Sequence, residues 1–174
     1  MPQARIITRF PQDASGVAQY FTSHGYDVET EDPMEPRGSA VADIEVDRES
    51  GEIRVTHLYG ALDAGLAVNP ALVENQIEGM LIQATGRALI EEVQFTKTNV
   101  TSLDWKTYPV LRFADHPRVT PIVVQRLDER STGAGEEVMG AAVGAIANAF
   151  FDATGARVRE YPMTPDRVRA ALKA

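Results

Sequence analysis

The chain has 174 residues, a net charge of −8 and a hydrophobic content of 44%, which indicates about one globular domain with a sizeable core. The acidic balance disfavours nucleic-acid binding, because such proteins place Lys and Arg against phosphates. No apolar run approaches the ~20 residues that a membrane span needs. The start of the chain lacks a secretory signal, so we expect a cytoplasmic protein, or a periplasmic one only if an exported partner carries it. The absence of cysteine excludes disulfides and Cys-held iron–sulfur clusters from this sequence.

Residues 1–38 differ from the rest of the chain and form an N-terminal segment. Two apolar stretches flank a run with helical spacing, which predicts a strand, a helix and a strand. A connector rich in proline and acidic residues follows. We therefore treat residues 39–174 as a separate domain.

A hairpin is predicted at the start of this domain. Apolar and acidic residues alternate from Ala40 to Asp47, as in a half-buried strand. The turn sequence R-E-S-G-E follows, and I-R-V-T-H-L-Y-G returns. This order indicates two antiparallel strands.

A long helix is predicted next, from the cap residue Asn69 and Pro70 to about Glu91. One side of it carries two amides and two glycines, in the order Gln76, Gly79, Gln83 and Gly86. Each glycine inside a helix costs roughly 1 kcal/mol relative to alanine, so something should come close to the backbone there. A flat polar ligand and a tightly packed neighbouring helix both satisfy this expectation.

The second half of the chain predicts further strands and two helices. V-Q-F-T, Y-P-V-L-R-F, V-T-P-I-V-V-Q-R-L and R-V-R-E-Y have strand-like composition. One helix should end at Gly155, and a last helix should begin at Thr164 and Pro165. We expect an α+β fold with a mixed, largely antiparallel sheet packed against two main helices and a short C-terminal helix.

One candidate for chemistry stands in S-T-G-A-G-E-E-V-M-G, where Glu136 follows two glycines. If this site is buried, desolvation raises the pKa of the Glu136 carboxyl towards neutrality and makes it a competent general base. Alternatively, Glu136 and Glu137 only favour the positive end of the following helix dipole. The residues alone favour the second interpretation.

No metal ligand is predicted in this chain. The three histidines, His24, His57 and His116, lie far apart in the sequence. None of them has the two-His spacing that is typical of a metal site.

Five stretches share their order and spacing with a known family. They are A-L-D-A-G-L-A-V-N-P, N-Q-I-E-G-M-L-I-Q-A-T-G-R-A-L-I-E-E-V, S-L-D-W-K-T-Y-P-V-L-R-F, T-G-A-G-E and A-I-A-N-A-F-F-D-A-T-G-A-R-V-R-E-Y-P-M-T-P-D-R-V. From about Ala40 onwards the chain resembles the C-terminal part of the molybdenum-binding large subunit of the xanthine dehydrogenase/aldehyde oxidase family. The closest likeness is to the isoquinoline 1-oxidoreductase and nicotinate dehydrogenase type.

The resemblance implies roles for five residues. Gln76 and Gln83, with Gly79 and Gly135 from the same motifs, would bind molybdopterin, often carried as its cytosine dinucleotide. Glu136 would be the catalytic base for the oxidation of an aldehyde or an N-heterocycle, with water as the oxygen source.

Two positions depart from the family pattern. Ala84 replaces a glycine after Gln83, which weakens the case for close backbone approach there. Glu137 stands where proline or alanine is common. A second negative charge at that position would raise the pKa of Glu136 by repulsion, or would mark a site that has drifted.

The family's large subunits are several hundred residues longer, so the resemblance also implies partners. We expect the remaining part of the molybdenum subunit and an iron–sulfur subunit that receives the electrons, and exposed apolar surface also suits a homodimer. The chain is then a split subunit, a fragment, or a relative that serves as a non-catalytic binding or assembly module. By itself it should be inactive, and the sequence does not identify the substrate.

Overall fold

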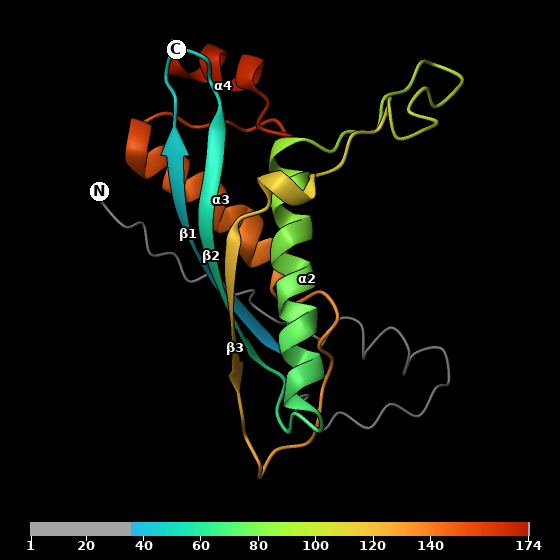
Figure 1. Cartoon of the computed structure of the whole chain (residues 1–174), viewed down its shortest axis with the longest axis vertical. Coiled ribbons are helices and arrows are strands. Elements are labelled where there is room, and N and C mark those ends of the chain that lie inside the picture. The colour runs from blue at the N-terminus through green and yellow to red at the C-terminus, as the bar shows by residue number, and fades with distance from the viewer. Residues whose placement is uncertain (1–35, 174) are drawn as a thin grey trace, which may run out of the picture.

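A computed structural model of the chain describes residues 36–173 (Figure 1). The strand, helix and strand expected before the connector therefore lie outside the described residues. Within them, the order of elements is strand, strand, helix, short 3-10 helix, strand, helix and helix.

The predicted hairpin is confirmed. β1 (Arg37–Val46) pairs antiparallel with β2 (Ile53–Asp63), with a bulge between Asp43 and Ile44. Asp47 closes the turn, because its carboxylate accepts hydrogen bonds from the N–H groups of two turn residues, Glu49 and Ser50, at 2.8 and 3.2 Å. β1 begins at Arg37, slightly before the expected Ala40.

The sheet is mixed, as expected. β3 (Arg118–Val124) pairs parallel with β2, which gives the strand order β1-β2-β3. A parallel neighbour needs a crossover connection, and the segment between β2 and β3 supplies it with α2 and the short helix η1 (Phe113–Asp115).

The three predicted helices are confirmed, together with their end signals. α2 (Pro70–Leu89) begins after Asn69, whose side chain accepts the Leu72 N–H at 3.2 Å. α3 (Met139–Thr154) ends at Gly155, which has the left-handed φ of 75° that favours glycine. α4 (Pro165–Leu172) follows Thr164.

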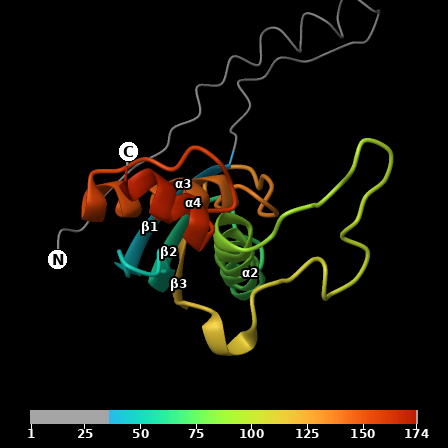
Figure 2. The ribbon, with the colours of Figure 1, turned by 90° about the horizontal axis from the view of Figure 1, so that it is seen from above.

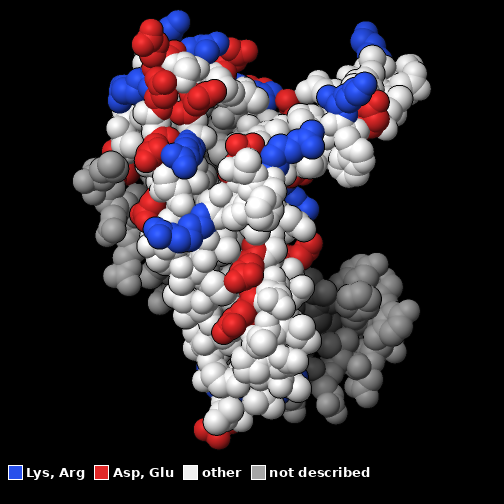
Figure 3. Space-filling model, viewed as in Figure 1, with Lys and Arg blue, Asp and Glu red and all other residues white. Residues whose placement is uncertain are grey.

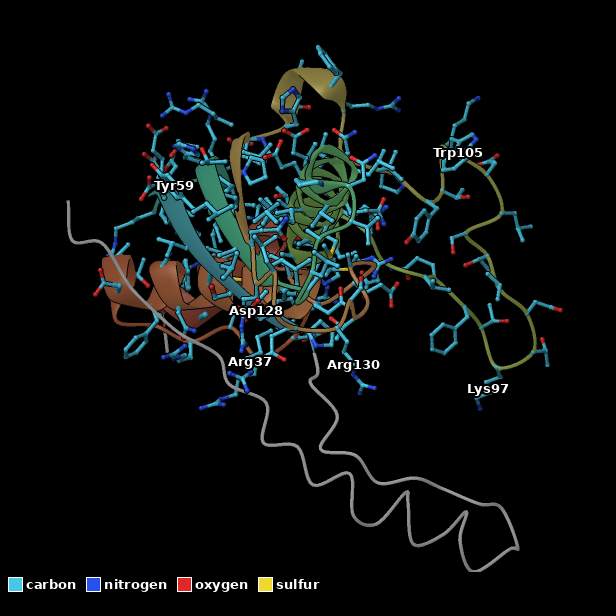
Figure 4. The ribbon with its side chains drawn as sticks, turned by 90° about the horizontal axis from the view of Figure 1, so that it is seen from below. Arg37, Tyr59, Lys97, Trp105, Asp128 and Arg130 are labelled. Carbon is cyan, nitrogen blue, oxygen red and sulfur yellow. The ribbon has the colours of Figure 1, made fainter. Side chains whose placement is uncertain are left out.

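α2 and α3 cover one face of the sheet, and no described helix covers the other (Figures 1 and 2). The core between sheet and helices includes Leu58 and Leu62 of β2, Ile77 and Leu81 of α2, and Ile146 of α3. A second cluster of Phe150, Met163 and Val168 joins α4 to α3. Tyr59 projects from the opposite, open face of the sheet (Figure 4).

Charged side chains gather at one end of the molecule. Figure 3 shows them around α4 and the turn between β1 and β2, whereas the lower half of this view is mainly uncharged. None of the helices in residues 36–173 is long and apolar enough to cross a membrane.

Three predicted strands are wrong. V-Q-F-T contributes only one isolated bridge, between Phe95 and Val100, and neither Y-P-V-L-R-F nor R-V-R-E-Y is a strand. Strand propensity reflects packing against neighbouring strands, and these segments have no strand beside them. In R-V-R-E-Y, Val158 instead packs against the second cluster and Arg157 lies over the ring of Phe151.

Candidate functional site

The five residues to which the sequence assigns a role fall in two places. Gly135 and Glu136 lie in the turn that leads into α3, and Gln76, Gly79 and Gln83 lie on α2. The side chains of both glutamines and of Glu136 are exposed. The structure therefore presents all three polar groups at the surface.

A glycine of β2 lies where α2 and the turn before α3 meet, on the buried side of α2 and not on the side of its exposed glutamines. A Cβ atom built on Gly60 would lie 3.0 Å from side-chain carbons of Ile77, Leu81 and Val138. Ile77 and Leu81 belong to α2, and Val138 is the buried residue just before α3. Because these three side chains meet at one point over β2, the turn that carries Glu136 is held beside the middle of α2.

A second glycine fixes the turn against β1. A Cβ on Gly38 would lie 2.3 Å from the backbone oxygen of Glu137 and 2.9 Å from the nitrogen of Val138. No side chain fits in that space. The backbone after Glu136 therefore rests directly on the first residues of β1.

A contact between side chains also links the two helices. The guanidinium of Arg87, near the end of α2, donates to the sulfur of Met139 at 2.8 Å. Met139 is the first residue of α3. The turn is thus held on both sides, by β1 beneath it and by α2 beside it.

The two adjacent carboxylates have different surroundings. Glu137 turns back on its own loop and accepts the Glu136 N–H at 3.0 Å. Its other carboxylate oxygen lies 2.9 Å from where a Cβ on Gly133 would be, so the glycine leaves room for it. The carboxylate of Glu136 is exposed, and no hydrogen bond joins it to another residue of the described part of the chain.

The position of Glu136 bears on the helix-dipole interpretation. The cap of α3 is Val138, and the first turn of α3 contains no acidic residue. The effect of a helix dipole falls off beyond the terminal turn. Favourable interaction with the dipole therefore explains Glu136 less well than it would explain an acid inside α3.

The two glycines of α2 differ in their surroundings. A Cβ on Gly86 would lie 2.3 Å from a carboxylate oxygen of Glu91, so contacts within the chain account for that glycine. Apart from adjacent residues and the backbone of its own helix, no heavy atom would lie within 4 Å of a Cβ on Gly79, and none beyond the adjacent residues would lie within 4 Å of a Cβ on Gly135. Nothing in residues 36–173 explains why Gly79 and Gly135 lack a side chain.

The site offers hydrogen-bonding groups and no set of metal ligands. Among the described residues, no three His, Asp or Glu side chains are grouped so that they could hold a metal ion. The two amides of α2 can each donate and accept hydrogen bonds. The surface is suited to one side of a polar organic group that approaches Gly79 closely.

Sequence reasoning missed Gly38 and Gly60. A glycine inside a strand weakens the strand and often marks close approach of another backbone. Both glycines are visible in the sequence, but the sequence does not show which other segment packs against each of them.

The sequence model of the molybdopterin cofactor-binding domain family matches residues 7–117. Among curated proteins, one subunit of the nicotinate dehydrogenase of Pseudomonas putida is 47% identical over 132 residues, which are 76% of this chain and 11% of that protein. The beta subunit of isoquinoline 1-oxidoreductase from Brevundimonas diminuta is 31% identical over 125 residues, 72% of this chain and 16% of that protein.

Solved structures match as well. The aldehyde oxidoreductase of Desulfovibrio desulfuricans superposes with a TM-score of 0.69 at 28% identity, over 77% of this chain and 15% of that one. Quinoline 2-oxidoreductase of Pseudomonas putida 86 gives a TM-score of 0.67 at 22% identity, over 90% of this chain and 22% of that one, and supports the fold alone. The chain thus spans only about a tenth to a fifth of the length of these proteins. It is a partial molybdopterin-binding domain and belongs to the molybdenum hydroxylase family.

Proposed function

We propose that this chain is the C-terminal cofactor-binding portion of a molybdenum hydroxylase that oxidises an aldehyde or an N-heterocycle. It supplies one side of the cofactor site, and the remaining part of the molybdenum subunit supplies the other. An iron–sulfur partner receives the electrons, since this sequence has no cysteine with which to hold a cluster. The cofactor is molybdopterin in its cytosine dinucleotide form, and the assembly works in the cytoplasm.

The observation that carries this proposal is the open space at Gly79. The glycine costs stability in the middle of a helix, and, apart from adjacent residues and the backbone of the same helix, no described atom lies within 4 Å of the place where its Cβ would be. Gln76 and Gln83, one turn to either side on the same helix, are exposed. A flat polar group lying along this part of α2 would use the glycine for close approach and the two amides for hydrogen bonds.

Within such a site this chain has two tasks. Gln76 and Gln83 hold and orient the cofactor, which supplies the two-electron oxidation when it is bound. Glu136 accepts a proton as general base. A carboxylate works best in that role when it is enclosed and poorly hydrated, so enclosure by the rest of the subunit is a condition for catalysis.

A second candidate function is a non-catalytic binding or assembly module. The exposed apolar residues of the described chain favour it, because they fit contact with another protein. The two functions differ in what they require of Glu136, since a module does not need a base.

The test begins with co-expression of the chain and the reading frames beside it. The purified assembly should contain molybdenum and should oxidise aldehydes or N-heterocycles with an artificial electron acceptor. Glu136→Gln keeps the shape of the side chain and removes the base. We expect turnover to fall by about 10²- to 10⁴-fold, with molybdenum content unchanged.

Glu137→Gln is the matched control. It neutralises the adjacent carboxylate and keeps an oxygen that can accept the Glu136 N–H, so turnover should fall far less. If the purified chain is a molybdenum-free monomer with no stable partner, the proposed enzymatic function is refuted. An assembly that contains molybdenum and turns over normally with Glu136→Gln would favour the binding module.

A further inference from the structure

Residues 91–112, which we call the arm, leave the end of α2 and extend away from the sheet and helices before η1 (Figures 1 and 2). Several large apolar side chains of the arm are exposed: Val93, Phe95, Val100, Leu103 and Trp105. Exposure reaches 80% at Leu103 and 72% at Trp105, the one tryptophan of the chain. Figure 4 shows Trp105 and Lys97 far from the core of the domain.

Hydrogen bonds within the arm give it a defined shape. The bridge between Phe95 and Val100 is closed by a turn in which the Thr96 N–H donates to the Asn99 oxygen at 2.8 Å. Beyond it, Asp104 accepts the N–H groups of Lys106 and Thr107 at 3.0 Å each. Leu103 and Trp105 lie on either side of Asp104 in the sequence, and both are exposed.

The base of the arm is fixed to the domain. The hydroxyl of Tyr108 donates to the carboxylate of Glu91 at 3.0 Å. The Leu111 Cβ lies 3.6 Å from where a Cβ on Gly86 would be, which places it beside α2. The arm therefore has a fixed root and a shaped tip, although an isolated two-stranded hairpin is only marginally stable in water.

We propose that the arm inserts into the remaining part of the molybdenum subunit, in an apolar pocket that receives Leu103 and Trp105. The inference rests on the proposed function and adds the contact that joins the two parts. Exposed aromatic residues of this kind are the usual anchors of protein interfaces. They are also costly to leave in water when several are close together.

The length of the relatives and the charge of the arm indicate what binds the arm. This chain matches only 11–22% of the length of the curated relatives and solved structures reported above, so most of such a subunit lies outside the matched part. Between positions 93 and 107 the arm has three charged residues, Lys97, Asp104 and Lys106. The carboxylate of Asp104 already accepts hydrogen bonds within its own turn. The large side chains that the arm offers to a partner are therefore mainly apolar, and they suit an apolar pocket in a protein.

The test uses, as a tagged partner, the matching nicotinate dehydrogenase subunit from Pseudomonas putida, with the segment that corresponds to this chain deleted. The full-length chain should co-purify with it. Docking should also protect the bonds after Lys97 and Lys106 from trypsin, because both lysines are exposed in the free chain. The double variant Leu103→Ser/Trp105→Ser should bind about tenfold more weakly or worse, and trypsin should cut both sites again.

Leu127→Ser is the matched control, because Leu127 lies outside the arm and is 71% exposed, close to the value for Trp105. It should bind as the parent chain does. The same variants are also made in a chimera, in which this chain replaces the matched segment of the full-length relative. Trypsin cleavage is measured on this chimera as well, so that the result does not depend on whether the shortened partner folds alone.

The outcomes separate this inference from the proposed function. If the chain binds and the arm variant binds equally well, the arm inference is wrong and the proposed function stands. If the parent chain does not bind the shortened subunit and the chimera contains no molybdenum, the proposed function fails. A dimer of the chain alone that the arm variant converts to a monomer would assign the arm to a second copy, and would also overturn the inference.

Discussion

Replacing Gly79 with alanine separates stability from cofactor binding at one position. Alanine is favoured over glycine inside a helix by about 1 kcal/mol. Apart from adjacent residues and the backbone of α2 itself, no described heavy atom lies within 4 Å of the new methyl group, so packing against the rest of the described chain does not oppose this gain. The isolated chain should become more stable by up to ~1 kcal/mol, which raises the melting temperature of a chain of this size by about 2–4 °C.

The same substitution should impair the assembled enzyme. The methyl group occupies space that we assign to the cofactor, so molybdenum and pterin per mole of protein should both fall. Thermal unfolding followed by circular dichroism measures the first effect in the chain alone. Metal analysis and pterin fluorescence of the purified assembly measure the second.

Gly86→Ala is the internal control, because it adds the same methyl group elsewhere in the same helix. Its Cβ would lie 2.3 Å from a carboxylate oxygen of Glu91, so the end of that side chain, which also accepts a hydrogen bond from Tyr108, must shift. The gain in helix propensity should then be reduced or lost. If Gly79→Ala destabilises the chain, or leaves cofactor content unchanged, the proposed role of Gly79 is wrong.

Two further predictions concern the sheet. Gly60→Val should destabilise the chain by about 1–3 kcal/mol, measured by urea unfolding, because three side chains already lie 3.0 Å from its Cβ position; an unchanged midpoint would contradict the packing described at this point. His57 is buried, and burial lowers its pKa, with a further contribution from the positive charge of Arg118 and an opposing one from Asp43. The unfolded state then binds the proton more readily than the folded state. The stabilising contribution of neutral His57 should be fully present above about pH 6.5, and the free energy of unfolding should fall as the pH drops towards the pKa of the folded state. His57→Gln should reduce this pH dependence, and an unaltered pH profile in that variant would refute the prediction.

The hydrogen bonds of His57 define which nitrogen carries its proton in the neutral form. The Arg118 Nε can only donate, so Nδ1 accepts this bond at 3.2 Å. Nε2 therefore carries the hydrogen and donates to the Thr120 hydroxyl at 2.7 Å. Protonation of His57 breaks the bond from Arg118 and places two cations side by side, which is the physical reason for the expected loss of stability.

The helices were predictable from the sequence because their signals are local. Asn69 with Pro70, Gly155, and Thr164 with Pro165 each mark a helix end within two residues. The failed strands depended on distant neighbours. Phe95 and its surroundings have the composition of a strand, but only a partner strand makes it one, and the arm has none beyond its own bridge.

The sequence proposes a set of candidate site residues, but it does not show the surface on which they lie. From the sequence alone, Gly79 and Gly86 cannot be told apart, because both lie inside the same predicted helix. The structure distinguishes them, since the side chain of Glu91 lies against Gly86 and no described side chain lies against Gly79. Likewise, only the three-dimensional structure shows that side chains of α2 and of the turn before α3 both pack against Gly60.

The openness of the site links assembly to catalysis. The backbone that follows Glu136 is closely packed, because β1 lies against Glu137 and Val138 is buried, yet the carboxylate of Glu136 is exposed. The general base that we propose at Glu136 needs both a fixed position and a site from which water is excluded. The packing of the turn would provide the first, and we propose that the rest of the subunit provides the second. Contacts far from Glu136, such as those we propose for the arm, should therefore affect turnover through the enclosure of this carboxylate.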